Sequence, residues 1–529
     1  KVVSIAKQSL MVNKRKLIVC AGDPEGREAL NLIKQNFTSE IVSFLMPSGA
    51  NGRGHSIRAI LELARFFKSD VVLLEADLIS QGESGIKPDW VDRMAKPIFE
   101  DYDMSIASFK RHPFEDIIGK ILVAPVIAAL YGTKFSDPLS GVFAISHDLV
   151  EEFCSEFDQS REYLGGYGIN PWLITTALKL NKKICEVNLG AKLSPVSSGK
   201  KYIVIKEMLR VLFECIKRDE EIWLKDSGII KTPDVFTIEQ EDVPLKVCCN
   251  FKEYLDSFLE GMCHYDSSLQ KVLNKEMFMH IENMTKSYIA PDYSPDIWAK
   301  IAYRFILTDN FSSEILQEDL LEAFLVIYNG MVASLIRQIE KTKKSFKDTD
   351  IDMDAITSSQ IEVIYKNTAM AFIKYKAYFL EDWRQKVEAT SPVLTPLDYL
   401  EFIPGVPIVL PKKIYGRGKR EVNTGEVFKR LQEKYNCAFT SFLNTINLDE
   451  NASSQEIGRR LTEVMEELEY TIDSLCPGDL YSLEGTEEVV NHIFKIFPHN
   501  KVLAVKWQVL RKLLQEYPPG NLILRMGFR

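Results

Sequence analysis

A chain of 529 residues is too long for a single hydrophobic core, which predicts two or more domains. Its hydrophobic content of 46% and charged content of 26% are typical of a soluble globular protein. The net charge of −9 argues against nonspecific binding to nucleic acid, so we expect no nucleic-acid partner. The cysteines are scattered without a C-x-x-C pair, which favours reduced thiols and a cytoplasmic location over a disulfide framework or a zinc site.

The first elements are a predicted helix over 2–12, a strand over 15–20 and the loop 22–26. Further along, Gly52-Arg53-Gly54 comes before a helical run over 59–67. Glycines let backbone amides approach an anion, a helix N-terminus favours negative charge, and an arginine can pair with phosphate. The turn therefore indicates a phosphate site, with a plain turn as the structural alternative.

The most informative segment is the apolar run over 71–74, which predicts a buried parallel strand ending on Glu75 and Asp77. Side chains alternate along a strand, so we expect these two carboxylates to point to the same side. Two close carboxylates repel unless a cation joins them, and a hard divalent ion that also holds a diphosphate suits oxygen ligands. An incidental acidic loop is the alternative.

The following segments predict a strand over 106–112 and an apolar helix over 117–130 that contains Gly119 and Lys120. Beyond them the chain carries two motifs, then a predicted helix over 171–180 and a strand over 184–189. The motifs are Asp137-Pro138-Leu139-Ser140-Gly141-Val142-Phe143-Ala144-Ile145-Ser146 and Gly166-Tyr167-Gly168-Ile169-Asn170, and Gly190-Ala191-Lys192 follows the last strand.

In this order, the glycine turn, the acidic pair and the two motifs resemble GT-A glycosyltransferases of the family 2-like group. The resemblance is to the subgroup that contains mannosylglycerate synthase and glucosyl-3-phosphoglycerate synthase, and it covers residues 1–220 or so. It implies an α/β GT-A domain, a nucleotide-diphospho-sugar transferase with a Rossmann-like mixed sheet. The family opens with one more strand, so a strand is expected ahead of residue 1.

The resemblance also implies roles for the motif residues. Asp77 and Asn170 are the expected catalytic residues, and Glu75 and Asp77 are the expected ligands of Mg²⁺ or Mn²⁺. Gly119, Lys120 and Tyr167 are expected to bind the acceptor. The residues expected to bind the nucleotide sugar are Asp23, Gly52, Arg53, Gly54, Glu75, Ala76, Leu139, Ser140 and Gly141.

Three positions depart from the family pattern. Glu75 replaces the usual aspartate and keeps its charge, whereas Asn170 stands where the relatives have a carboxylate that an amide cannot imitate as a base. Ser194 lies where the relatives have a metal-binding histidine. We therefore expect Glu75, Asp77 and the diphosphate alone to hold the metal.

Beyond residue 222 the strand patterns give way to helical periodicity. We predict a GT-A domain over 1–225, a linker over 226–244 and an all-α domain over 245–529, through which the protein is a candidate homo-oligomer. The loop 392–420 carries the basic run 412–420, which is either a solvated linker, a cover for the acceptor site or a peripheral contact with anionic lipid. The clearest predicted helices are 297–307, 316–339, 359–386 and 454–475.

The function expected from these features is transfer of a hexose from a nucleoside diphosphate sugar to a small hydroxylated acceptor, such as glycerate or phosphoglycerate. One alternative is an enzyme similar to polyprenyl-phosphate sugar transferases. The departures at Asn170 and Ser194 keep a catalytically degenerate GT-A scaffold as another. A nucleotidyltransferase is disfavoured, since no G-x-G-T-R-like opening is present in the chain.

Overall fold

The structure is a computed structural model. It describes residues 18–22, 27–36, 41–46, 52–78, 80–81, 84–111, 114–159, 164–192, 201–225, 229–237, 250–286, 292–312, 314–345, 353–390, 413–415 and 421–423. The predicted helices over 2–12 and 454–475, and most of the loop 392–420, lie outside these residues.

A five-stranded mixed sheet forms the centre of the N-terminal half, in the order β3-β7-β6-β8-β9. Strand β7 is antiparallel to both of its neighbours, whereas β8 is parallel to β6 and β9 is parallel to β8. Strands β3, β6, β8 and β9 therefore all point the same way. The strands are β3 (Val71–Leu73), β7 (Phe143–Ile145), β6 (Met104–Lys110), β8 (Ile184–Ala191) and β9 (Asp234–Phe236).

The remaining strands form two-stranded pairs. The first pair is parallel and is joined by helix α2 (Arg27–Asn36), while the other two are antiparallel. The predicted mixed α/β class is confirmed by this arrangement. The pairs are β1 (Ile18–Gly22) with β2 (Ile41–Leu45), β4 (Ser80–Gln81) with β5 (Ser84–Gly85), and β10 (Lys413–Tyr415) with β11 (Glu421–Asn423).

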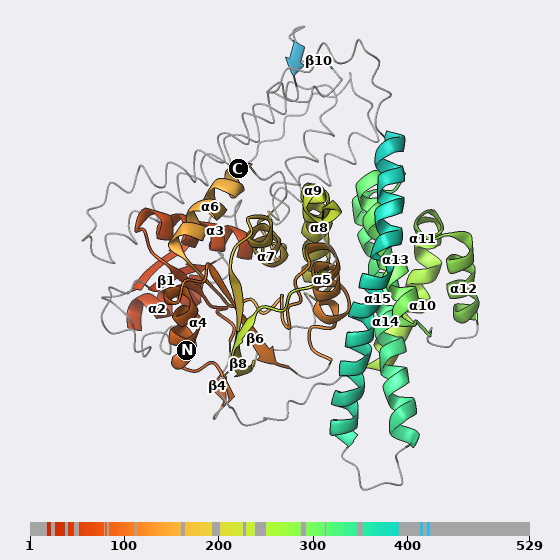
Figure 1. The fold of residues 1–529 in the computed structure, drawn as a ribbon, viewed down its shortest axis with the longest axis horizontal. Coiled ribbons are helices and arrows are strands. Elements are labelled where there is room, and N and C mark those ends of the chain that lie inside the picture. Colours follow the sequence, from red (N-terminus) through yellow and green to blue (C-terminus); the bar gives the residue numbers. More distant parts are fainter. Residues whose placement is uncertain are drawn as a thin grey trace.

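Helices cover both faces of the sheet (Figure 1). Side chains of β6 alternate between the faces. Met104 and Ile106 pack into one apolar cluster, and Ala107 and Phe109 into another with Trp90 of α4. Helix α4 (Asp89–Phe99) covers the second face, and the first is covered by α3 (Arg53–Phe66), α5 (Ala124–Tyr131), α6 (His147–Gln159) and α7 (Ile169–Lys179).

The C-terminal half of the described chain is helical, and the predicted helices over 297–307, 316–339 and 359–386 are confirmed. Its helices share one apolar cluster with the sheet, and α15 packs directly on α5. The helices are α8 (Lys201–Arg218), α9 (Glu220–Leu224), α10 (Phe251–His264), α11 (Asp266–Val272), α12 (Lys275–Lys286), α13 (Pro295–Phe311), α14 (Gln317–Ser345) and α15 (Met353–Thr390).

The boundary between the two parts differs from the expected linker in one respect. Strand β9 falls within 226–244 and pairs with β8, so the sheet extends into that segment. The division into domains over 1–225 and 245–529 stays a prediction, because the described helices and the sheet bury their apolar side chains in the same cluster.

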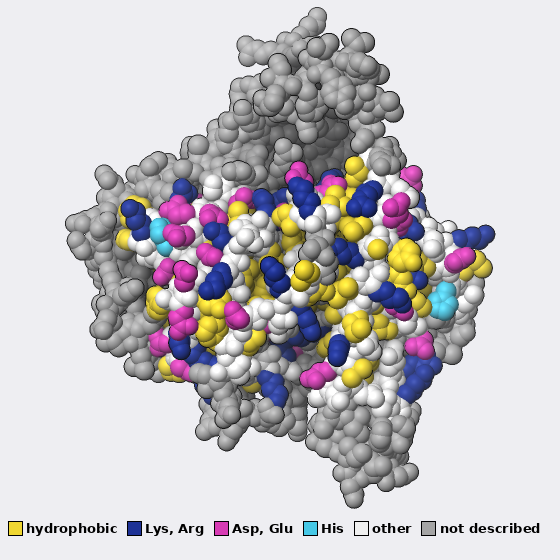
Figure 2. Space-filling view, in the orientation of Figure 1, with side chains coloured by type: hydrophobic (Ala, Val, Ile, Leu, Met, Phe, Trp, Pro, Cys, Tyr) yellow, Lys and Arg dark blue, Asp and Glu magenta, His cyan; other side chains and the backbone are white. Residues whose placement is uncertain are grey.

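One helix in the described part of the chain, Gln317–Thr342, is long and apolar enough to cross a membrane. Of its most apolar window, 89% is buried inside the protein, which is the behaviour of a core helix. On the face seen in Figure 2, basic and acidic side chains are interspersed over the described surface.

Candidate functional site

The topology brings the predicted motifs to one edge of the sheet. Strands β3, β6 and β8 all end at this edge, where open α/β sheets bind ligands, and the antiparallel β7 begins there. Glu75 follows β3, Arg111 follows β6, Lys192 follows β8, and the loop 136–141 leads into β7. We call Arg53, Glu75, Arg111, Asp137 and Lys192 the edge cluster.

Glu75 is the centre of the edge cluster. Its Oε2 accepts a hydrogen bond from the buried Lys192 Nζ, and its Oε1 lies 3.1 Å from Arg53 Nη1. Burial alone raises the pKa of Glu75, but the Lys192 ammonium and the Arg53 guanidinium outweigh it, and the pKa is lowered. Glu75 is therefore a carboxylate that is already neutralised by protein cations.

Arg53 lies in the glycine turn as the first residue of α3, and its side chain contacts both the 137–146 motif and the 166–170 motif. Its Nη2 donates to Gly141 O at 2.8 Å and its Nε to Asn170 Oδ1 at 3.3 Å. The guanidinium also lies over the Tyr167 ring, 5.8 Å from its centroid. Its helix start is fixed because Gly54 N donates to Gly165 O at 2.8 Å, an approach that a side chain at Gly54 would block.

Asp77 lies in a different environment from Glu75. Strand β3 ends at Leu73, so both carboxylates lie in the following loop, and the strand alternation expected to align them does not apply. Asp77 is exposed and makes no hydrogen bond or ion pair with another described residue. Burial of part of the carboxyl and the nearby Glu75 raise its pKa. Within the described residues, no group of three or more His, Cys, Asp and Glu side chains is placed to hold a metal.

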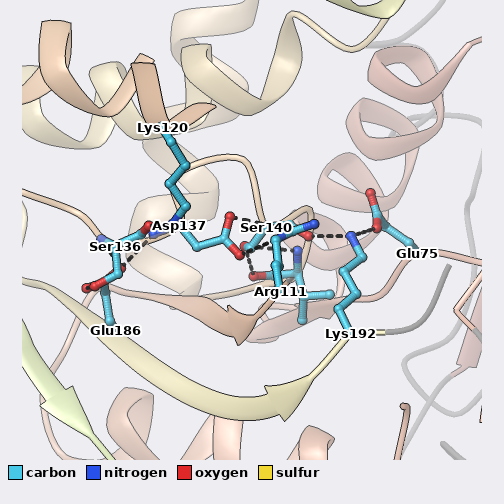
Figure 3. Close-up of polar contacts among 9 residues, drawn as sticks. Glu75, Arg111, Lys120, Ser136, Asp137, Ser140, Glu186 and Lys192 are labelled. Atoms are coloured by element: carbon cyan, nitrogen blue, oxygen red, sulfur yellow. Dashed lines mark hydrogen bonds and ion pairs between the residues drawn. The ribbon is translucent and has the colours of Figure 1, made fainter. Parts of the chain in front are cut away.

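The loop 136–141 is held by charged groups on both sides, as Figure 3 shows. Glu186 of β8 accepts from Ser136 N at 2.7 Å and from Ser136 Oγ at 2.8 Å. On the other side, Arg111 forms a two-point pair with Asp137, at 2.8 and 3.2 Å. Lys192 Nζ also donates to Ser140 O at 2.9 Å, so a single ammonium fixes both this loop and Glu75.

Gly141 allows this loop to approach Glu75. Its φ is +77°, which favours glycine, and a Cβ there would lie 2.1 Å from Glu75 Oε1. Leu139 and Ser140 are buried beside it, and the Ser140 hydroxyl donates to Val142 O at 3.2 Å. These two residues therefore offer main-chain groups to the site, with their side chains turned into the protein.

The structure separates the three residues expected to bind the acceptor: Gly119 and Lys120 follow Arg111 in the chain, whereas Tyr167 lies beside Arg53. Gly119 begins a π-helix, η2 (Gly119–Val123), and the Lys120 Nζ donates to Ser136 O. Asp116 is just ahead of them, and a Cβ on Gly119 would lie 2.2 Å from Asp116 Oδ2. Tyr167 lies on the Arg53 side, where its N–H donates to Glu207 Oε2 at 2.9 Å.

The structure thus gathers Arg53, Glu75, Gly141 and Asn170 around one point, with Asp77 and Ala76 exposed in the adjoining turn. Asp23 and Ser194 lie outside the described residues. Sequence reasoning missed the structural roles of Arg111, Asp116, Asp137, Glu186 and Lys192. Three of them could have been found from their position in the chain. Arg111 and Lys192 directly follow strands, and Asp137 lies in the loop before one.

Comparisons with known proteins give limited information. No family model matches the chain, and no curated protein matches its sequence. Two solved structures of glucosyl-3-phosphoglycerate synthase from Mycobacterium tuberculosis are similar, one in complex with Mn²⁺, UDP-glucose and phosphoglyceric acid and one with Mg²⁺ and UDP. Each is 15% identical, with a TM-score of 0.28 over 43% of this chain and 86% or 85% of the other. Because that TM-score is low, the site is interpreted from its own residues.

Proposed function

We propose that the edge cluster binds the diphosphate of a nucleoside diphosphate sugar and that the protein transfers the hexose to a small hydroxylated acceptor. The observation that carries the proposal is the meeting of Arg53, Glu75 and Lys192 at the ligand-binding edge of the sheet. Two cations are held in place there before any ligand arrives. Such preorganised charge stabilises a leaving group on which negative charge develops.

The structure leaves one of the two expected metal ligands, Asp77, open to a divalent ion. Glu75 is occupied by Lys192 and Arg53, whereas the exposed Asp77 carboxylate has no protein partner within the described residues. Mg²⁺ is commonly held by one or two carboxylates together with substrate phosphates, which Asp77 and a diphosphate satisfy. An ion bound in this way supplies positive charge to the departing diphosphate.

Three groups of residues are then proposed to bind the phosphate, the sugar and the acceptor. Arg53 pairs with a phosphate oxygen through its guanidinium, and Glu75 and Asn170 orient it. The main chain around Ser140 and Gly141 is in place to bind sugar hydroxyls, since Lys192 and Arg53 fix its carbonyl groups. The acceptor binds on the side of Gly119 and Lys120. Glycerate and phosphoglycerate are the acceptors that we propose first.

A noncatalytic scaffold is the second candidate, and one observation favours it. The Glu75 carboxylate is already neutralised, so of the two carboxylates expected to hold a metal only the exposed Asp77 remains open to one. The two candidates differ in nucleotide-sugar turnover, so binding alone does not separate them.

Release of the nucleoside diphosphate in the presence of glycerate or 3-phosphoglycerate separates the two candidates, because the scaffold would release none. Calorimetric titration with UDP-glucose, GDP-mannose and ADP-glucose, each with Mn²⁺ or with EDTA, tests the donor site itself. Arg53→Ala should weaken binding by about 1–3 kcal/mol, or about 5- to 150-fold, because it removes a charge-assisted phosphate contact. Asp77→Ala should remove the effect of Mn²⁺. Arg65→Ala is the control, since Arg65 is on the same helix but pairs with Glu151 at 2.8 Å. If the Arg53→Ala and wild-type proteins bound the nucleotide sugars with equal affinity, the glycine turn would have a structural role only.

A further inference from the structure

Asp116 is a half-buried residue whose carboxylate the proposed reaction has not yet used. Its Oδ2 is shielded from solvent and has no hydrogen-bond partner among the described residues. Its φ of +51° lies in the left-handed region, which few residues other than glycine adopt. A buried polar atom without a partner calls for an explanation, and backbone in the left-handed region is found disproportionately at functional sites.

The cations around Asp116 are each bonded to another group. Arg111, after β6, is held by Asp137 in the loop before β7, and Lys120 in η2 donates to Ser136 O. Lys192, after β8, is bonded to Glu75 and Ser140. These groups set the potential at the Asp116 carboxylate without donating a hydrogen bond to it.

The position of this carboxylate depends on a glycine. A Cβ on Gly119 would fall 2.2 Å from Asp116 Oδ2, so only glycine there leaves the carboxylate in place. Burial raises the pKa of the Tyr328 hydroxyl on α14, and the charge of Asp116 is among the smaller causes of that rise. A carboxylate between Gly119, Lys120 and Arg111 therefore stands next to the residues expected to bind the acceptor.

We propose that Asp116 accepts the hydrogen bond of the acceptor hydroxyl and takes its proton during transfer, while Lys120 pairs with a carboxylate or phosphate group of the same acceptor. The inference rests on the proposed glycosyl transfer to an anionic hydroxy compound and adds the group that takes the proton of the acceptor. A hydroxyl is the donor that Oδ2 lacks, and an ammonium beside it selects an acceptor of negative charge.

The step is balanced within the two substrates and Asp116. The acceptor oxygen forms a bond to the anomeric carbon, and the bond from that carbon to the diphosphate oxygen breaks. Its electron pair leaves with the nucleoside diphosphate, and the hydroxyl proton passes to Asp116 Oδ2. Arg53 and Lys192 stabilise the negative charge on the leaving diphosphate.

The protonation of Asp116 suits this role. Burial raises the pKa of its carboxyl to about 6; Arg111, Lys120 and Lys192 oppose the rise, and Asp137 adds to it. Above that pH the group is a carboxylate and is ready to receive a proton, and a base is most effective when its pKa lies near the working pH. We therefore expect the rate of transfer to fall as the pH drops through 6.

The test compares wild type with Asp116→Asn, using Asp101→Asn as the matched control. Asp101 also has a positive φ, +70°, but it is exposed and precedes β6, at the opposite end of that strand from Arg111 and the edge cluster. Three quantities are measured: affinity for UDP-glucose, GDP-mannose and ADP-glucose, transfer to 3-phosphoglycerate and D-glycerate from pH 5 to 9, and the melting temperature.

Asp116→Asn should bind the nucleotide sugars as tightly as wild type, but its transfer rate should be at least 100-fold lower. The remaining rate should no longer decrease as the pH drops through 6. It should also melt at a higher temperature than wild type above that pH, because it removes an unpartnered buried charge. The gain should disappear near pH 4, where Asp116 is protonated in wild type. Asp101→Asn should match wild type throughout.

Other results would overturn the inference. Full transfer by Asp116→Asn would show that another group takes the proton, and a lower melting temperature would show that the carboxylate is structural. Nucleotide-sugar binding without transfer to either anionic acceptor would refute the acceptor class and leave the donor site standing. Absence of nucleotide-sugar binding by wild type would refute the proposed function itself, and the Asp116 inference with it.

Discussion

Lys192→Met tests whether the edge cluster is held together by one ammonium. The side chain of Lys192 is 7% exposed, and its Nζ donates both to Glu75 and to Ser140 O. Methionine keeps the length of the side chain and its apolar contacts but removes both hydrogen bonds. The buried Glu75 carboxylate would then be left with Arg53, 3.1 Å away, as its remaining charged partner.

The expected loss follows from the contacts. A hydrogen bond to a charged group contributes about 1.5–3 kcal/mol, and breaking a buried ion pair costs about 3–5 kcal/mol. Because Arg53 still compensates part of the charge, we expect the free energy of unfolding to fall by about 3 kcal/mol at neutral pH. Lys179→Met removes a pair with Glu156 at 2.7 Å whose side chains are both more exposed than those of Lys192 and Glu75, and it should cost about 1 kcal/mol.

The pH dependence provides an independent check. In wild type the pKa of Glu75 is lowered below its ordinary value of 4.5, so the pair stabilises the protein above that pH and the contribution is lost as the pH falls through the folded-state pKa. In Lys192→Met the burial of Glu75 is opposed by Arg53 without Lys192, and its pKa rises. The difference between the two proteins should therefore be greatest at neutral pH and decrease in acid.

Urea unfolding followed by tryptophan fluorescence, from pH 4 to 8, measures these differences. Combining Lys192→Met with Glu75→Gln completes a double-mutant cycle, in which the coupling energy should exceed about 1.5 kcal/mol, the lower value for a hydrogen bond to a charged group. Additive effects of the two substitutions, or a cost for Lys192→Met that does not change with pH, would refute the assignment of Lys192 as the partner of Glu75.

Two further substitutions test the remaining contacts. Gly141→Ala should destabilise the protein in urea by more than the roughly 1 kcal/mol expected for Gly132→Ala, since both residues have positive φ but only Gly141 leaves no room for a Cβ, 2.1 Å from Glu75 Oε1. Equal costs would mean that Glu75 moves freely. Asn170→Asp should keep or raise hexose transfer, because a carboxylate still accepts from Arg53 Nε at 3.3 Å, whereas Asn170→Ala should reduce it. Faster transfer by the alanine variant than by the aspartate variant would contradict this role.

The parts of the fold that could be predicted are those set by local patterns. Apolar periodicity located α13, α14 and α15, and the run over 71–74 located β3. Local patterns failed where pairing partners decide the structure. Residues 234–236 gave no strand signal because β9 exists through its pairing with β8. The alignment of Glu75 with Asp77 failed for a similar reason, because the strand ends at Leu73, where its pairing with β7 stops.

The candidate site was predictable in its anionic and glycine-rich segments, but the contributions of Arg111 and Lys192 were not. Arg53 was identified because it lies within the glycine turn. Arg111 and Lys192 come from strands far apart in sequence, and they meet because β6 and β8 are parallel, with an irregular register between Ser108 and Lys110. Such a meeting depends on the register of the strands, which no spacing within one segment reveals.

The helical half has a structural connection to the proposed acceptor side. The segment η2 (Gly119–Val123) is a π-helix, a rare form that occurs mostly as a single turn next to an α-helix and is frequent at functional sites. Trp298 of α13 donates its indole N–H to Ile121 O at 2.7 Å, and α15 packs against η2. These contacts stabilise the irregular backbone that carries Gly119 and Lys120. A sheet domain without α13 and α15 would lose these contacts. We infer that the two helices maintain the backbone geometry of Gly119 and Lys120.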